Sequence, residues 1–174
     1  EGSTTFDPPQ NRPQIRLAAQ AFGAYQRALE TVESANLKHT IPYFLHMSEY
    51  LAQFDTVLTG AKLAEIRQAQ PWIDLVQEHR QWPPELAVPN ALIHGDCKIN
   101  NALFDDAGGR VLAIIDLDNN MHGNWAWDFG DLVRSVALSR GGFDSEDFQA
   151  CVTGFRAGKG KQDLDADCLV SAPA

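Results

Sequence analysis

A switch from helical to strand-like patterning at Ala91 constrains the fold of this chain more than any other feature. Upstream of it, apolar residues recur every three or four positions from Pro13 onward, which predicts amphipathic helices. Downstream, the β-type runs 102–104 and 111–115 flank a turn that contains Gly108-Gly109. This pattern is typical of a β-hairpin, because glycine tolerates the positive φ of tight turns. The sequence therefore predicts an α+β fold in which a hairpin is set among helices.

The rest of the chain is predicted to be mostly helical. We expect helices over residues 13–32, through much of 40–80 with an end or kink at Pro71, over 126–139, and over 145–157 with Ser145 as N-cap. Gly, Pro and Asn in residues 1–12 predict a linker or post-hinge segment. Residues 13–174 then form one domain, whose Gly-, Asp- and Ala-rich C-terminal end from residue 158 we expect to be frayed or truncated.

Charge and cysteine usage narrow the class of protein. The net charge of -9 provides no basic surface for nucleic acid or an anionic membrane, so neither partner is expected. No uncharged apolar run is long enough to span a membrane and no signal pattern opens the chain, which favours a cytoplasmic protein. Cys97, Cys151 and Cys168 lack CxxC spacing, so we expect unpaired thiols rather than a zinc site or a disulfide framework.

The segment His94-Gly95-Asp96-Cys97-Lys98-Ile99-Asn100-Asn101 carries the groups that phosphoryl transfer needs. An Asp can orient and deprotonate an attacking hydroxyl, a Lys can balance charge on the moving phosphoryl group, and an Asn oxygen can bind Mg²⁺. We therefore group Asp96, Lys98 and His94 as catalytic candidates. For the His94 ring, hydrogen bonding that holds the loop is favoured over proton transfer.

The hairpin places a second carboxylate near this loop. If its two-residue turn is Gly108-Gly109, Asn101 lies opposite Asp116, and directly opposed side chains are close enough for their oxygens to share one small cation. A slip of a residue or two would still bring the two ends of the hairpin together. Asn101 and Asp116 are therefore the candidate metal ligands.

With Ile115-Asp116, this loop resembles the catalytic loop and metal-binding aspartate of the protein-kinase-like fold. Position 95 is Gly, where protein kinases usually carry Arg. In this respect the loop resembles that of the aminoglycoside phosphotransferase and choline kinase branch. Together with residues 128–134 (Asp-Phe-Gly-Asp-Leu-Val-Arg) and 40–44 (Thr-Ile-Pro-Tyr-Phe), the chain most resembles the N-acetylhexosamine 1-kinase group, from Phe6 onward. It departs from that group at residues 121–123 (Met-His-Gly) and 44–46 (Phe-Leu-His), which line the expected acceptor side.

The resemblance implies the C-terminal lobe of the kinase-like fold, with the N-terminal lobe that grips ATP missing from this chain. It implies Asp96 as the base, Lys98 as a phosphate contact, and Asn101 and Asp116 as Mg²⁺ ligands. It also implies a bracing role for Asp128, through backbone amides of the loop, and substrate-side positions for Asp118, Asp131 and Arg134. From the residues alone, Asp118 could instead cap a turn, and Arg134 could pair with Asp131 on the helix surface.

The leading hypothesis is a Mg²⁺-dependent small-molecule kinase that transfers the γ-phosphoryl group of ATP to a hydroxyl of a sugar or amino sugar. We expect the isolated lobe to be a poor catalyst, because no Gly-rich phosphate loop precedes residue 13. The alternatives are an aminoglycoside- or choline-type kinase and a kinase-like lobe that binds a ligand or partner without turnover. A metal-dependent phosphoesterase built on His94, Asp96, Asp116 and His122 fits less well, because two-metal hydrolases need more ligands.

Overall fold

The structure, a computed structural model, describes residues 2–32, 37, 41–81, 90–138 and 141–160. It contains both helices and small antiparallel sheets, so the predicted α+β class is confirmed. The chain divides into two compact units, one formed by residues 1–41 and 89–174 and the other by residues 42–88. All the predicted site residues belong to the first unit.

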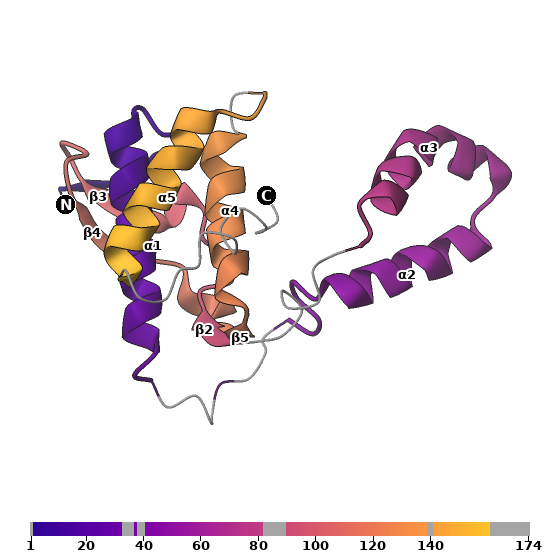
Figure 1. Cartoon of the computed structure of the whole chain (residues 1–174), viewed down its shortest axis with the longest axis horizontal. Helices are drawn as coiled ribbons and strands as arrows, with labels where there is room; N and C mark the ends of the chain where they lie inside the picture. Colours follow the sequence, from indigo (N-terminus) through magenta and orange to yellow (C-terminus); the bar gives the residue numbers. More distant parts are fainter. Residues whose placement is uncertain (1, 33–36, 38–40, 82–89, 139–140, 161–174) are drawn as a thin grey trace. The chain divides into compact units, whose positions relative to one another are not determined.

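The body of the first unit is built on helices α1 (Arg12–Leu29), α4 (Trp125–Ala137) and α5 (Ser145–Lys159) (Figure 1). Each helix begins at a side-chain cap that accepts hydrogen bonds from N–H groups of the first turn, and the caps are Asn11, Asn124 and Asp144. The N-cap of α5 is therefore Asp144, and the prediction of Ser145 was one residue late. The expected end of that helix at residue 157 was early, because α5 continues to Lys159. Residues 161–174, where fraying was expected, lie outside the described residues.

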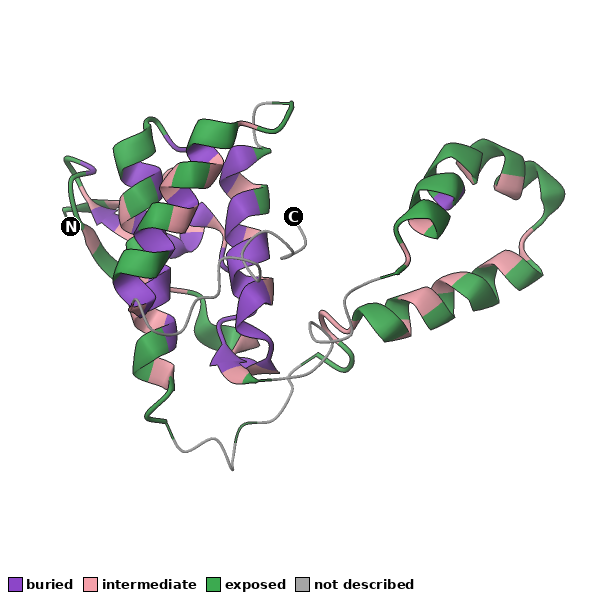
Figure 2. Cartoon of the chain, viewed as in Figure 1, coloured by how far each residue is buried: buried purple, intermediate pink, exposed green. Residues whose placement is uncertain are grey.

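Helix α1 packs closely on α5 through glycines. The apolar stripe of α1 is buried, as its periodicity predicts, with Ile15, Ala18 and Phe22 fully covered. A Cβ atom on Gly154 of α5 would run into the carbonyl oxygen of Arg16. Gly23 and Gly158 make similarly close approaches to backbone atoms of the opposite helix. The two backbones can therefore approach to a distance that larger side chains would forbid, and Figure 2 shows the buried faces that result.

The predicted hairpin is present, with a different turn. Strands β3 (Ala102–Asp105) and β4 (Val111–Ile114) pair antiparallel, and β1 (Ser3–Thr4) adds to the outer edge of β3. The turn is closed by a hydrogen bond from Gly108 N to Asp105 O at 2.8 Å and one from Asp105 N to Arg110 O at 2.9 Å. The connection is thus residues 106–109 rather than Gly108-Gly109 alone, and the pairing shifts once more between Leu103 and Phe104.

A second small sheet flanks the predicted catalytic loop. Strand β2 (Ala91–Ile93) pairs antiparallel with β5 (Met121–Gly123). The loop leaves β2 at His94 and ends in the short 3-10 helix η2 (Ile99–Asn101), which runs directly into β3. A similar short helix, η3 (Leu117–Asn119), connects the hairpin to β5. The loop is therefore held at both ends by strands.

The second unit consists of helices α2 (Met47–Gly60) and α3 (Leu63–Glu78). Helix α3 runs through Pro71, so of the predicted end or kink at this residue the end does not occur. Its first turn is capped by the Glu65 side chain, which accepts a hydrogen bond from Lys62 N at 2.9 Å. None of the residues of α2 is buried and Ile73 is the buried residue of α3, so this unit has little core of its own (Figure 2). Among the described residues, no helix is long and apolar enough to cross a membrane.

Candidate active site in the loop after strand β2

The loop that begins at His94 is anchored by a buried carboxylate from α4. Asp128 is 1% exposed, and its two oxygens accept hydrogen bonds from His94 N at 2.8 Å and Gly95 N at 2.9 Å. Gln26 Nε2 donates a third bond at 2.8 Å. Burial raises the pKa of Asp128, and these three hydrogen bonds oppose that rise because they favour the ionised form. The first turn of α4 thus fixes the backbone at the point where β2 becomes the loop.

The His94 ring is fully buried and ties the loop to the hairpin. Its Nδ1 accepts a hydrogen bond from Asp96 N at 3.2 Å, which assigns the ring proton to Nε2. Nε2 then donates to the Ile115 carbonyl oxygen at 3.0 Å. The rings of Phe22 and Tyr25 pack edge-on against it, with centroids 5.7 and 5.6 Å away. Since both ring nitrogens are engaged within the protein, the ring is placed to hold the loop.

The Asp96 carboxylate collects the other two polar side chains of the loop. Its Oδ2 lies 2.9 Å from Lys98 Nζ and accepts a hydrogen bond from Asn101 Nδ2 at 3.2 Å. The same Nδ2 donates to the Asp96 carbonyl oxygen at 2.8 Å. The hydrogen bond from Lys98 to Asp96 raises the pKa of Lys98 above its usual value, which keeps the ammonium charged. The structure therefore brings Asp96, Lys98 and Asn101 together.

Asp116 follows the hairpin residue that pairs with Asn101. Ile115 N donates to Asn101 O at 3.0 Å, so Asn101 lies opposite Ile115 and the predicted pairing with Asp116 was one residue too far. The four-residue connection moves the pairing by two residues from the prediction, and the irregularity between Leu103 and Phe104 moves it back by one. Asp116 itself is exposed and adopts the left-handed conformation, with φ 62° and ψ 61°.

Contacts on both sides of Asp116 fix this uncommon backbone against the loop. Before it, Ile115 is bonded to Asn101 and to the His94 ring. After it, Asn119 lies against Gly95, where a Cβ atom would be 2.7 Å from the Asn119 carbonyl oxygen. Gly95 also has φ +79°, so only glycine fits there without strain. A non-glycine residue in the left-handed backbone conformation costs about 1–3 kcal/mol, so the contacts on either side must hold Asp116 in it.

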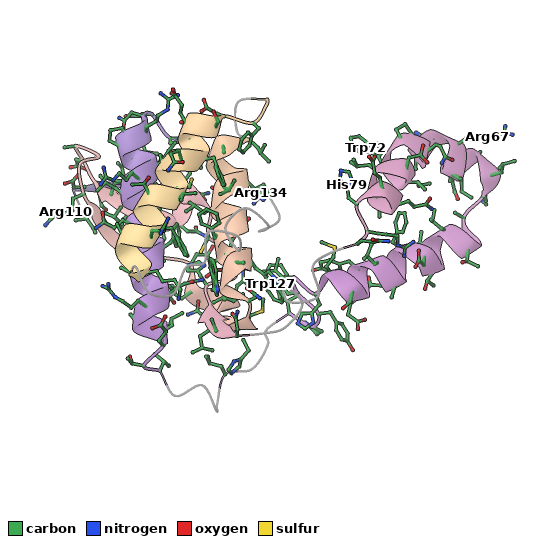
Figure 3. The ribbon with its side chains drawn as sticks, viewed as in Figure 1. Arg67, Trp72, His79, Arg110, Trp127 and Arg134 are labelled. Atoms are coloured by element: carbon green, nitrogen blue, oxygen red, sulfur yellow. The ribbon has the colours of Figure 1, made fainter. Side chains whose placement is uncertain are left out.

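The predicted substrate-side residues are only partly gathered. Asp131 Oδ1 accepts from Arg134 Nε at 3.0 Å, so the ion pair predicted between these two residues is present. Figure 3 labels Arg134 on α4. The charges of both residues act on Lys98, so the pair lies beside the loop. Asp118 is exposed on η3.

His122 lines a cavity of about 580 Å³ together with Gln26, Leu92, Trp125 and Lys159. Neither Asp96 nor Asp116 is among the residues of that cavity, which weakens the phosphoesterase grouping.

The sequence model of the phosphotransferase enzyme family (APH) matches residues 1–165. The chain belongs to this family. The resemblance to the aminoglycoside phosphotransferase and choline kinase superfamily is thereby confirmed, and the chain is a phosphotransferase of kinase type at the level of its family.

Members of the phosphotransferase family generally use a divalent cation, for which Asn101 and Asp116 are the predicted ligands. Both amide hydrogens of Asn101 point to Asp96, so its Oδ1 is left to accept. The exposed Asp116 carboxylate is next to the partner of Asn101. Among the described residues, no cluster of three or more His, Cys, Asp or Glu side chains could hold a metal. A site of one amide and one carboxylate oxygen fits Mg²⁺, which usually keeps waters and phosphate oxygens as its other ligands.

Sequence reasoning missed the side chains that hold the phosphotransferase loop from other elements. Gln26 of α1 bonds Asp128, and Ser135 Oγ of α4 accepts from Ile99 N at 3.2 Å. Tyr25 OH accepts from Asn120 Nδ2 at 2.6 Å, just after η3. Gln26 follows Phe22 by one helical turn, and a polar residue at that spacing is the one signal that could have revealed it. Ser135 and Tyr25 carry no comparable signal.

Proposed function

We propose that this chain carries the catalytic residues of a kinase that transfers the γ-phosphoryl group of ATP to a hydroxyl of a sugar or amino sugar, with Mg²⁺. The observation that carries the proposal is the cluster at Asp96, whose Oδ2 contacts Lys98 Nζ and Asn101 Nδ2. Such a carboxylate, lysine and amide are the parts that phosphoryl transfer needs. Family membership supports phosphotransferase activity in general.

The roles follow from which atoms remain available. The hydrogen bonds and ion pair of the Asp96 side chain all go to Oδ2, and its side chain is 18% exposed, so Oδ1 can accept a hydrogen bond from an acceptor hydroxyl. As the acceptor oxygen forms its bond to the γ-phosphorus, the bond to the bridging β–γ oxygen breaks and ADP leaves. The hydroxyl proton passes to Asp96, and the Lys98 ammonium balances charge on the transferred group.

The cation would be held by Asn101 and Asp116. When bound, Mg²⁺ neutralises negative charge on the nucleotide's phosphate oxygens. Asp128 and His94 would serve the reaction only by holding the loop, since neither has a free polar atom facing outward in the hydrogen bonds described above. We further propose that the chain corresponds to the C-terminal lobe of a kinase-like fold, and that an N-terminal lobe supplies the remaining grip on ATP.

For the acceptor, the proposal follows the N-acetylhexosamine 1-kinase resemblance. Asp131 is the strongest candidate for a contact, because its Oδ2 is buried and has no hydrogen-bond partner among the described residues. A buried carboxylate oxygen of this kind is suited to a hydroxyl or amine donor. Arg134, exposed and paired with the other oxygen, would orient Asp131, and Asp118 would lie further out.

The test is phosphoryl transfer from γ-labelled ATP to a panel of hexosamines and N-acetylhexosamines, in the protein that carries this chain. Asp96→Asn should lower kcat by about 10²- to 10⁴-fold, the usual contribution of a general base. Asp106→Asn removes an exposed carboxylate at the hairpin turn and is the matched control, for which no change is expected. Full activity in Asp96→Asn would disprove the assignment of the base.

The non-catalytic alternative gives a different result in the same protein. A lobe that binds Mg²⁺ and ATP without turnover would show no transfer to any acceptor, yet it would be stabilised by Mg²⁺ with ATP in a thermal-shift assay. Asp116→Ala should abolish that stabilisation under either function. Transfer that depends on Asp96 separates the kinase from the binding lobe.

A further inference from the structure

Gln26 is a buried amide on the face of α1 that packs on the core. It is 2% exposed and lies one turn beyond Phe22 on the stripe that faces the core. Burying an amide is unfavourable unless its hydrogen bonds are made elsewhere. Gln26 Nε2 donates to Asp128 Oδ2 at 2.8 Å and to the Trp125 carbonyl oxygen at 3.2 Å. Both partners are pure acceptors, so the orientation of the amide is fixed with the nitrogen toward α4.

The same carboxylate oxygen also binds the loop. Asp128 Oδ2 accepts from Gln26 Nε2 and from His94 N, both at 2.8 Å, while Oδ1 accepts from Gly95 N. Because Trp125 is the first residue of α4, Gln26 holds both the carboxylate and the helical turn that carries it. Its own Oε1 is buried without a partner among the described residues. An apolar side chain would avoid that cost, so what the amide contributes is the pair of bonds from Nε2.

We propose that Gln26 is a positioning residue for the loop that carries Asp96. Its amide holds the Asp128 carboxylate in the orientation that accepts from His94 and Gly95. This inference rests on the proposed function only in treating the loop as catalytic. Structurally, the inference is a series of hydrogen bonds that runs from Gln26 of α1, through Asp128, to the N–H groups of the two residues before Asp96.

Amide hydrogen exchange of the 174-residue protein reports directly on these hydrogen bonds, and we would compare exchange rates in wild type, Gln26→Met and Gln14→Met. Gln14 is the matched control, since it lies on the same helix and is also 2% exposed, but its side chain bonds Gln10 N at the other end of α1. In Gln26→Met, the amides of His94 and Gly95 should exchange about tenfold faster or more, relative to core amides of α5, because a hydrogen bond to a charged acceptor is lost. Gln14→Met should leave that ratio unchanged.

Gln26→Glu distinguishes positioning from space filling. At acid pH the introduced carboxyl is protonated and can donate to Asp128, which should restore protection of His94 and Gly95. As the pH rises and this carboxyl ionises, it repels Asp128 and protection should fall. Among the described residues, the His94 ring, the Cys97 thiol and the Tyr25 hydroxyl also interact electrostatically with Asp128, and they are the same in every variant.

Two outcomes would overturn the proposal. One is equal protection of His94 and Gly95 in Gln26→Met and Gln14→Met. The other is a Gln26→Glu profile, corrected for intrinsic exchange, that does not change with pH, and this readout stands even if Gln26→Met does not fold. Amide exchange requires no phosphoryl transfer. If the proposed function is wrong, the transfer assay will show it, and the exchange rates will still test the role of Gln26.

Discussion

Replacing Asp128 tests whether one buried carboxylate organises the loop. Its Oδ2 accepts two hydrogen bonds and its Oδ1 accepts one. In Asp128→Asn the amide oxygen can take the place of Oδ2, and the amide nitrogen then faces Gly95 N. One charge-assisted bond is lost, worth about 1.5–3 kcal/mol. The neutral amide is also cheaper to bury than a carboxylate whose pKa burial has raised, so the net loss should be about 1–2 kcal/mol.

Asp128→Ala should be much worse, because it leaves three buried donors without an acceptor. At about 1–3 kcal/mol for each of the three unsatisfied groups, the loss should reach roughly 3–9 kcal/mol. Urea unfolding followed by tryptophan fluorescence measures both variants, and Trp125, which stacks on Phe155 at 6.1 Å, reports on this region. Asp131→Asn on the next turn of α4 is the control, with an expected loss below about 1 kcal/mol because its partner Arg134 is exposed to solvent.

The ranking of the three variants carries the test. Equal losses for Asp128→Asn and Asp128→Ala would mean that the hydrogen bonds do not set the energy. Losses for both that match Asp131→Asn would mean that Asp128 is not the anchor of the loop. Amide exchange at Gly95 should also separate the variants, since Asp128→Asn removes the acceptor of that amide and keeps the acceptor of His94.

Two further predictions concern the scaffold and the ion pair of the loop. Gly154→Ala and Gly158→Ala should destabilise the fold, because a Cβ atom at either position meets the backbone of α1. This loss opposes the preference of a helix for alanine over glycine, which is about 1 kcal/mol. Gly109→Ala is the control and should be neutral in the same urea titration, because its Cβ atom meets nothing within 4 Å. The pKa of Lys98 is raised in the folded chain by its hydrogen bond to Asp96. The contribution of this pair to stability is therefore fully present below the ordinary pKa of 10.5 and is lost as the pH rises through the higher folded value. The stability difference between wild type and Lys98→Met should be flat from about pH 6 to 9 and shrink above about pH 10.5.

Local sequence predicted the parts of the site that depend on neighbours along the chain. The loop and hairpin could be placed because Gly95, the β-type runs and the Gly108-Gly109 turn are local signals. The register could not be predicted to the residue, since it depends on the turn that forms. Asp105 closes that turn with its own carbonyl, and its Oδ1 accepts from Gly109 N at 2.8 Å, which favours the longer connection.

The residues that hold the loop from outside could not be predicted in this way. Gln26 and Asp128 are 102 positions apart, and Ile99 and Ser135 are 36 apart. No periodicity or spacing relates such pairs, because their contact arises only when α1 and α4 pack on the loop. The same holds for burial in α2, whose helical pattern was evident but whose residues are not buried, since periodicity shows a face and not what covers it.

The polar groups of the loop fall into two sets, and the division bears on what the site can bind. Those of His94, Gly95 and Ile99 are satisfied by α4 and the hairpin. The side-chain oxygens that these contacts leave open are all acceptors: Asp96 Oδ1, Asn101 Oδ1, the Asp116 carboxylate, and Asn100 Oδ1, which is buried without a partner among the described residues. In a chain of net charge -9, such a site repels a triphosphate that carries no cation. The positively charged side chain of this loop, Lys98, is already paired with Asp96. Under the proposed function, nucleotide should therefore bind with its cation or hardly at all, and titration of ATP with and without Mg²⁺ measures that dependence.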